Sequence, residues 1–316
     1  MCGIVAYIGQ QQAAPIIVKG LKRLEYRGYD STGISLYNGT EIQTIKTTGK
    51  VSDLEAKFQG RDPIQATIGI GHTRWATHGV PNDVNAHPQT SNSGDLVVVH
   101  NGIIENHEEL RKSLSVDGYT FISDTDTEVI VHLIHKLSAV YPDLRSAVFA
   151  ANQQLVGAYG MAVVDSQSPG QLVVARSGSP LVIGYGLGEH FVASDQLALL
   201  PVTRRFAVLE EGDVAQITKE SVSIIDASGE PVSRPIEESD ITADAGGKAG
   251  YKHYMLKEIF EQSEAIRRTL QGRIVDGKVA EDAFGNGSLE LFEAIKHVQI
   301  VACGTSYNAG MVARYW

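Results

Sequence analysis

Cysteine is scarce in this chain. The 316 residues include two cysteines, Cys2 and Cys303, which stand near opposite ends of the sequence. Proteins held together by disulfides carry many cysteines at regular spacings, so this sequence has no disulfide framework. We therefore expect the protein to work in a reducing compartment.

Basic runs and long hydrophobic runs are also missing. No block rich in Lys and Arg occurs and the formal net charge is −10, which excludes the usual electrostatic signature of binding to nucleic acid or to an anionic membrane. No stretch reaches the ~18 to 20 apolar residues of a membrane-spanning helix, and the N-terminus lacks the pattern of a secretion signal. These absences predict a cytoplasmic protein that acts on small molecules.

The composition is that of a globular protein larger than one ordinary core. Apolar residues make up 43% and charged residues 20% of the chain, which are common values. A length of 316 residues exceeds what a single hydrophobic core usually fills, so we expect one large domain or two.

The hydrophobic pattern predicts sheets covered by helices. Short apolar runs predict strands at residues 3–8 and 33–37, within ATIGIGHTRW and DLVVVHNG, and in a series between residues 158 and 226. Strands, then helices, then strands again are typical of an α+β layered domain. Apolar residues at helical spacing predict helices over residues 13–24, 105–114, 127–137 and 144–155, the third behind a capping box at Thr125–Glu128.

The C-terminal part reads as a separate region. Residues 226–250 are polar, acidic and rich in Gly, Pro and Ser, which indicates a linker. Helices are expected in YKHYMLKEIFEQSEAIRRTL and LELFEAIKHV, followed by a strand at QIVA and a helix entered through CGTSYNAG. The two hydroxyls of CGTSYNAG at a helix N-terminus suit a phosphate group. A tail with one strand cannot bury much of a core, so we expect the beginning of a second domain.

The opening sequence MCGIVAYIG places Cys2 directly behind the initiator methionine. Removal of that methionine would leave a thiol and a free α-amine on one residue. Because an α-amine has a pKa of ~7.7 to 8.0, it is a ready general base at pH 7 for a thiol of pKa ~8.5. The alternative is a small buried hydrophobe. Gly3 favours the catalytic reading, since a missing side chain would let substrate approach the backbone beside the thiol.

Two loops carry polar groups suited to a carboxylate and to an oxyanion. HTRWATHG, residues 72–79, offers the guanidinium of Arg74 to a carboxylate, with Thr77 and His78 completing a polar pocket. A solvated turn around a packed tryptophan explains this loop equally well. VVVHNG, residues 97–102, offers the amide of Asn101 and the backbone N–H of Gly102 as two donors for an oxyanion, although an Asn-Gly turn is the commoner reason for this pair.

Three further features of the sequence are weaker indications of a functional site. Asp126, near a helix start, either favours the helix dipole or holds a substrate ammonium. His72 and His78 lack the spacing of a helical metal pair, and no cysteine or paired carboxylate accompanies them, so no metal site is expected. IGYGLGEH looks like a Gly-rich nucleotide loop, but a strand-like run follows where a helix is needed, which indicates a hairpin.

Eight segments of the chain resemble, in order, those of the glutamine–fructose-6-phosphate aminotransferase family, the glucosamine-6-phosphate synthases. The resemblance runs from Met1 to Trp316 and implies the N-terminal-nucleophile hydrolase fold of class II glutamine amidotransferases, an αββα sandwich, over residues 2–220. It implies a strand end and interdomain linker over residues 221–250 and an incomplete α/β sugar isomerase domain over residues 251–316. The segments are MCGIVAYIG, LEYRGYDSTGI, GHTRWATHG, NAHP, HNGIIENH, SDTDTEV, RSGSPLVIG and CGTSYNAGM.

The roles known in that family fall on matching residues of this chain. The resemblance implies that Cys2, exposed by methionine removal, attacks the glutamine carboxamide with its own α-amine as acid and base. Asn101 and the N–H of Gly102 would stabilise the tetrahedral oxyanion. Arg74 would bind the α-carboxylate of glutamine and Asp126 its α-ammonium.

Other matching residues would lie around the substrate. Thr77 and His78 would line the loop that closes over glutamine, and Trp75 would gate the passage of ammonia. Arg27 and Asp30 match a segment near the nucleophile.

The family converts fructose 6-phosphate and glutamine into glucosamine 6-phosphate, and neither a cofactor nor a metal is implied. Thr305 and Ser306 match the start of its sugar-phosphate site, but the remaining phosphate loops and the catalytic groups of that domain are not in this sequence. We therefore expect this chain to hydrolyse glutamine only. Fructose 6-phosphate would be a partner of a full-length chain, for which a homodimer is implied.

Two alternatives stay open. Other amidotransferases begin with the same Met-Cys-Gly, such as amidophosphoribosyltransferase and asparagine synthetase, but neither a ribose-phosphate loop with paired acids nor a Gly-rich pyrophosphate loop is found here. A module that binds glutamine or a partner without turnover belongs to a different class. A retained initiator methionine would produce that state, because it would tie the α-amine of Cys2 into a peptide bond.

Overall fold

The computed structural model describes residues 2–59, 62–241, 248–270, 273–275, 277–280 and 288–315. Contacts between residues divide the chain into two compact units, Met1–Ala249 and Gly250–Trp316. Residues 242–247, which belong to the segment expected to be a linker, lie outside the described residues.

Two antiparallel sheets form the centre of the first unit. The eight-stranded sheet has the strand order β15-β11-β9-β10-β1-β4-β2-β3, and the seven-stranded sheet has the order β14-β13-β12-β8-β7-β6-β5. The strands of the first sheet are β1 (Gly3–Ile8), β2 (Ser31–Tyr37), β3 (Ile42–Thr48), β4 (Ile68–Arg74), β9 (Val182–Tyr185), β10 (His190–Ala193), β11 (Arg205–Val208) and β15 (Glu237–Glu238). Those of the second are β5 (Gln89–Thr90), β6 (Leu96–Ile104), β7 (Gly157–Asp165), β8 (Leu172–Ser177), β12 (Val214–Ile217), β13 (Val222–Ile225) and β14 (Pro231–Val232).

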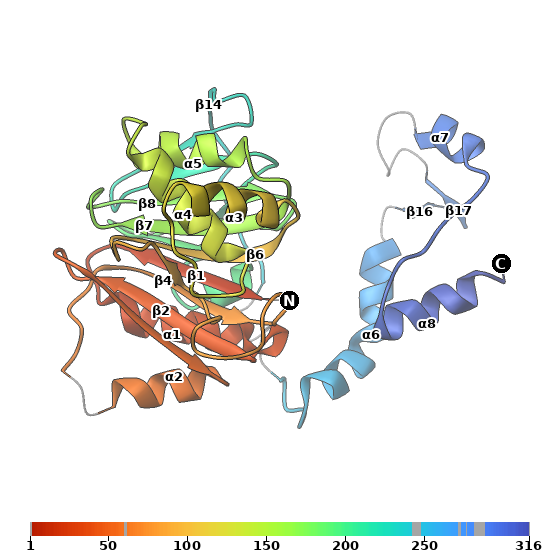
Figure 1. Cartoon of the computed structure of the whole chain (residues 1–316). Coiled ribbons are helices and arrows are strands. Elements are labelled where there is room, and N and C mark those ends of the chain that lie inside the picture. Colours follow the sequence, from red (N-terminus) through yellow and green to blue (C-terminus); the bar gives the residue numbers. More distant parts are fainter. Residues whose placement is uncertain are drawn as a thin grey trace. The chain divides into compact units, whose positions relative to one another are not determined.

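Helices cover the outer face of each sheet. Figure 1 shows α1 and α2 on one side of the two sheets and α3, α4 and α5 on the other. The unit is therefore an αββα sandwich, which confirms the predicted α+β class and the order of its layers. The helices are α1 (Ala13–Leu24), α2 (Val51–Phe58), α3 (His107–Val116), α4 (Thr127–Ser138) and α5 (Leu144–Asn152), with 3-10 turns at Glu25–Arg27 and Gln196–Ala198.

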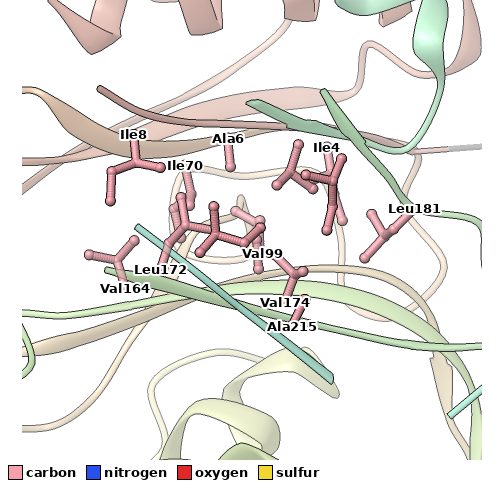
Figure 2. Packing of buried hydrophobic residues seen from close by; sticks show 14 of the residues in the cluster. Ile4, Ala6, Ile8, Ile70, Val99, Val164, Leu172, Val174, Leu181 and Ala215 are labelled. Carbon is pink, nitrogen blue, oxygen red and sulfur yellow. The ribbon is translucent and has the colours of Figure 1, made fainter. Parts of the chain in front are cut away.

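The main core lies between the two sheets. Alternate residues of β1 point into it, namely Ile4, Ala6 and Ile8, and they meet apolar side chains of the other sheet such as Val99 (Figure 2). The intervening residues, such as Val5, pack against the helical layer instead. Each fully buried aliphatic side chain of this kind contributes about 1.5–3 kcal/mol, so these interleaved faces hold the layers together.

The sheets extend past residue 220, where the sequence placed the end of the sandwich. β13 and β14 add to the edge of the seven-stranded sheet, and β15 pairs with β11 through Arg205 and Glu238. β13 falls within the predicted series of strands, whereas β14 and β15 were hidden in a polar segment, because edge strands carry Pro and charged residues that a central strand avoids. Part of the expected linker therefore belongs to the first unit.

The structure confirms some of the turns and helix ends predicted from the sequence and differs at others. β9 and β10 form the hairpin expected for IGYGLGEH, closed by a hydrogen bond from the N–H of Gly186 to the carbonyl of Glu189 at 3.0 Å. α4 begins at the expected residue, and the hydroxyl of Thr125 accepts from the N–H of Glu128 at 3.3 Å. The Glu128 carboxylate departs from a capping box, because it accepts from the N–H groups of Ile122 and Ser123 at 2.8 and 2.7 Å. β3 and α2 were not anticipated.

The second unit is mostly helical in its described residues. The predicted strand at QIVA is wrong: residues 299–302 form no strand, because β16 and β17 pair only with each other and no described strand lies alongside to supply a ladder. None of the described helices has the length and apolar character needed to cross a membrane. The elements are α6 (Tyr254–Leu270), β16 (Ile274–Val275), β17 (Lys278–Val279), α7 (Ser288–Ala294) and α8 (Gly304–Ala313).

Candidate active site

Strand alternation carries polar side chains to one end of the space between the sheets. At one end of each strand, a polar residue lies two positions from the last inward-facing apolar residue. It precedes Ile4 of β1, and it follows Ile70 of β4 and Val99 of β6. These are Cys2 beside β1, His72 and then Arg74 in β4, and Asn101 in β6. Because side chains two apart in a strand share a face, a change from apolar to polar residues in three neighbouring strands builds one polar end.

The sulfur of Cys2 lies against the backbone of Trp75. It accepts a hydrogen bond from the N–H of Trp75 at 3.2 Å and lies 3.5 Å from its carbonyl oxygen. Burial raises the pKa of the Cys2 thiol, and the hydrogen bond from Trp75 opposes that shift. The resting group at neutral pH is therefore a thiol, which needs a base to become a nucleophile.

Asn101 joins the cysteine to the second sheet. Its Nδ2 donates to the carbonyl oxygen of Cys2 at 3.2 Å, and its Oδ1 lies 3.0 Å from Nε2 of His72. The amide is thus held at both ends, beside the thiol.

Gly102 follows at a place that only glycine fits. Its φ of +129° lies in the left-handed region, and a Cβ on it would fall 1.9 Å from the carbonyl oxygen of Ala158. The backbone conformation between Asn101 and Ile103 therefore requires glycine at position 102.

We expect Gly102→Ala to destabilise the protein. The new methyl group forces β6 away from β7, because the atom it meets is backbone and cannot rotate aside. Strain of this kind costs about 1–3 kcal/mol or more. Thermal unfolding measures it, with Gly118→Ala as the control, since Gly118 also has a positive φ but an added Cβ there meets nothing within 4 Å. Equal melting temperatures for the two variants would contradict the steric account.

Arg74 is buried, and one of its guanidinium nitrogens forms no hydrogen bond to the described residues. Its Nη2 donates to the carbonyl oxygens of His78 and, at 3.3 Å, of Gly79, so the guanidinium shapes the loop that follows β4. Its Nη1 has no hydrogen-bond partner among the described residues. Burial lowers the pKa of Arg74, as expected for a cation removed from water, and the nearby charges of Cys2, Asp126 and Asp30 oppose that shift.

Asp126 is 4% exposed, at the residue before α4. One oxygen, Oδ2, accepts from the N–H of Ile104 at 2.9 Å and lies 4.0 Å from Nδ1 of His100. The carboxylate therefore contacts the last residue of β6, the strand that also carries Asn101.

A cavity of about 240 Å³ opens at this end of the sandwich. Its volume suits a ligand smaller than a drug-sized molecule. Four residues that the sequence did not single out contribute to its wall, namely Ile103, Ser179, Pro180 and Ser194. Six residues that it did single out complete the wall: Cys2, Arg27, Trp75, Thr77, Asn101 and Gly102.

Other predicted residues lie near the cavity without lining it. The Oδ2 of Asp30 accepts from the N–H of Ala76 at 2.9 Å, which ties the start of β2 to the loop after β4. His78 is half-buried, and its ring lies 5.2 Å from that of His107. Arg27, in contrast, lines the cavity and forms an ion pair with Asp195, which the sequence did not single out.

The expectation for Gly3 is wrong. A Cβ there would fall 2.7 Å from Cβ of Leu24 and 2.7 Å from Oγ1 of Thr73. Gly3 therefore allows α1 to approach the sheet closely, on the face opposite the core between the sheets, and does not open a path to the thiol.

Thr305 and Ser306 lie in the first turn of α8, in the second unit, and both are exposed. The described residues of the two units contain no group of three or more His, Cys, Asp and Glu side chains that could hold a metal ion.

Sequence reasoning missed three buried histidines beside the site. His72 was considered only as a metal ligand, and His87 and His100 not at all, yet all three are at most 5% exposed. One signal could have found His72, because it is a polar residue two positions after an inward-facing apolar residue of a central strand. This signal does not apply to His87 and His100.

The chain is similar over its full length to curated aminotransferases. The isomerizing glutamine–fructose-6-phosphate aminotransferase of Shewanella oneidensis is 57% identical to this chain over 316 residues, and that of Escherichia coli K12 is 55% identical over 317 residues. Each match covers 100% of this chain and 52% of the relative, so the chain spans about half the length of these curated relatives.

Solved structures give a related result. The glutamine phosphoribosylpyrophosphate amidotransferase of B. subtilis, complexed with ADP and GMP, has a TM-score of 0.63 and 27% identity over 73% of this chain and 50% of its own. A structure of the allosteric regulatory enzyme of purine biosynthesis gives the same TM-score of 0.63. The profile of the glutamine amidotransferase domain matches residues 59–233, more than half of the chain. The chain therefore belongs to the glutamine amidotransferase domain family.

Proposed function

We propose that this chain hydrolyses L-glutamine to glutamate and ammonia through a thioester on Cys2. The observation that carries the proposal is the hydrogen bond from Asn101 Nδ2 to the carbonyl oxygen of Cys2 at 3.2 Å, in the wall of one cavity. It places an oxyanion donor beside the residue that carries the thiol, and both residues line the same cavity. A nucleophile next to a preorganised donor is the arrangement that acyl transfer requires.

The first half of the reaction forms the thioester. With the initiator methionine removed, the α-amine of Cys2 takes the thiol proton while sulfur bonds to the carboxamide carbon of glutamine. The carbonyl π electrons move to oxygen, where Asn101 Nδ2 and the N–H of Gly102 stabilise the charge. The α-ammonium then gives its proton to the leaving nitrogen, the C–N bond breaks, and ammonia departs.

The second half releases glutamate. Water attacks the thioester carbon while the α-amine takes a proton from it, and the oxyanion forms again against the same donors. The C–S bond breaks, and the thiolate recovers the proton from the α-ammonium. The N-terminal amine thus serves as base and acid in turn.

Charged groups around the cavity give the site its preference for an α-amino acid. Arg74 would bind the α-carboxylate, an assignment supported by its buried, unpartnered Nη1. Asp126 would bind the α-ammonium through the oxygen that does not accept from Ile104. Thr77 and His78 would close over the substrate, and Trp75, which is 51% exposed, would control the exit of ammonia.

Arg74→Lys is expected to raise the KM for glutamine about 10- to 100-fold, because an ammonium cannot reproduce a planar fork on a carboxylate. Steady-state ammonia release measures it. Glutamine α-amide, which lacks the carboxylate, is the matched comparison: the wild-type preference for glutamine over this analogue should largely disappear in the variant. An unchanged preference would exclude Arg74 as the carboxylate ligand.

In a longer protein this activity would supply ammonia for glucosamine 6-phosphate synthesis from fructose 6-phosphate. The support is the identity of 55–57% to aminotransferases of which this chain spans about half. Residues 251–316 would then open a sugar isomerase domain, with Thr305 and Ser306 at its phosphate site, and the full-length form would be a homodimer. A role in phosphoribosyl chemistry has weaker support, since the solved phosphoribosylpyrophosphate amidotransferase shares 27% identity with this chain.

Intact mass read beside ammonia release tests the proposal. The expected result is a chain without its initiator methionine that releases ammonia from glutamine at a saturable rate. Full turnover by a chain that retains the methionine would contradict the α-amine as base. A processed chain that binds glutamine without releasing ammonia would favour the non-catalytic module.

A further inference from the structure

Three buried histidine rings lie together beside the cavity, and the proposed reaction uses none of them. His72, His87 and His100 are 0%, 5% and 2% exposed. The rings of His72 and His87 have centroids 4.3 Å apart, and those of His87 and His100 are 6.4 Å apart. Burying a polar ring costs free energy unless its nitrogen atoms form hydrogen bonds.

The contacts of Asn101 define what His72 does. One hydrogen of Nδ2 points to the carbonyl oxygen of Cys2, which leaves the second for a ligand in the cavity. Oδ1 of the amide faces Nε2 of His72 at 3.0 Å. Since Oδ1 can only accept, Nε2 must carry the hydrogen, and His72 is neutral with its proton on that nitrogen.

The remaining contacts hold the His72 ring in place. It packs against His87 with the two rings tilted by 34°, and Nε2 of His87 lies 3.1 Å from Oγ1 of Thr127. The same hydroxyl lies 3.0 Å from Nδ1 of His100, so it links the two rings. Burial lowers the pKa of His72 to about 3, and also that of His87 and His100, which keeps the rings neutral.

We infer that His72 is a positioning residue that fixes the direction of the Asn101 amide, an inference that rests on the proposed glutaminase function. An asparagine amide turned by 180° occupies the same space, but it would present Oδ1 to the oxyanion and repel it. A neighbour that only donates at this point removes that alternative, because it repels the turned Nδ2. His72 therefore acts on the reaction through Asn101 and does not touch the substrate.

Two substitutions separate donation from bulk. His72→Met keeps roughly the size of the side chain and removes the donor, whereas His72→Gln places an amide N–H close to the position of Nε2. We expect His72→Met to lower kcat about 10- to 100-fold with little change in KM, and His72→Gln to recover most of the loss. His132→Met is the control, because His132 is also fully buried but packs against Tyr119 and Phe121. It should leave kcat unchanged.

A double-mutant cycle identifies the route of the effect. In an Asn101→Ala background, His72→Met should cause no further loss of kcat, because the group it positions is gone. Losses that multiply would overturn the inference and indicate a structural role. Wild-type protein that releases no ammonia would instead refute the glutaminase proposal.

A second measurement needs no His72→Met protein and keeps the inference testable if that variant does not fold. Nitrogen-15 NMR of histidine-labelled wild-type protein reports which ring nitrogen carries hydrogen, with the His72 signals assigned from the spectrum of His72→Gln. We expect hydrogen on Nε2 and a neutral ring at pH 7. Hydrogen on Nδ1 would leave Nε2 unable to donate to Asn101 and would overturn the inference, whatever the kinetics show.

Discussion

Cys2→Ala is expected to abolish ammonia release from glutamine while leaving glutamine binding in place. The substitution removes the only sulfur among the described residues of the cavity wall and changes little else, because the contact from Asn101 Nδ2 is made to the backbone oxygen of residue 2. Loss of a covalent nucleophile lowers kcat on the order of 10⁴- to 10⁶-fold in enzymes of this type. A coupled assay for ammonia measures turnover, and calorimetry measures binding.

The second cysteine provides the control for this experiment. Cys303 is exposed and precedes α8 in the second unit, so Cys303→Ala should keep full turnover. Turnover that survives in Cys2→Ala, with binding weakened, would place the nucleophile elsewhere. It would make Cys2 a residue that only shapes the pocket.

Asn101→Ala has the second-largest expected effect, a loss of about 10²- to 10³-fold in kcat. The side-chain amide contributes a donor that matters only when negative charge develops on the carboxamide oxygen, so the loss should appear in kcat and leave KM nearly unchanged. Steady-state kinetics with glutamine measure both parameters. Pre-steady-state release of ammonia then shows whether formation of the thioester is the step that slows.

Asn92→Ala is a matched control for the loss of an amide. Asn92 binds the backbone of Thr120 through both ends of its side chain, with distances of 2.8 and 2.9 Å, and does not line the cavity. It should leave kcat unchanged. A rise in KM alone for Asn101→Ala would mean that the amide binds the ground state of glutamine and is not an oxyanion donor.

The layers of the fold could be predicted because their signals are local. The helix at Ala13–Leu24 and the strand at Gly3–Ile8 fall where the apolar spacing placed them. β5 has two residues and β15 has two, so neither shows a periodic pattern of its own. They exist because a neighbouring strand pairs with them, which is β6 for β5 and, far away in the sequence, β11 for β15. The strand expected at QIVA is absent because this apolar run has no described strand beside it with which to form backbone hydrogen bonds.

The site was predictable to the extent that single residues show their chemistry. A cysteine behind the initiator methionine, an Asn-Gly pair after a strand and an arginine before a glycine loop are visible in the sequence, and the structure brings Cys2, Asn101 and Gly102 to one cavity. Pairings across the two sheets are not visible. His72 meets Asn101, which lies 29 positions further along the chain, and Gly3 was misread because its neighbour Leu24 comes from a helix.

The most direct test of the Cys2 assignment uses a chloroketone analogue of glutamine, in which a chloromethyl group replaces the amide nitrogen. A thiolate held in the glutamine site displaces chloride and forms a stable thioether. We predict that one equivalent of the analogue attaches to Cys2, that turnover falls in parallel with labelling, and that excess glutamine protects against both. Inactivation with the label on another residue, or full labelling of Cys2 with turnover intact, would contradict the account.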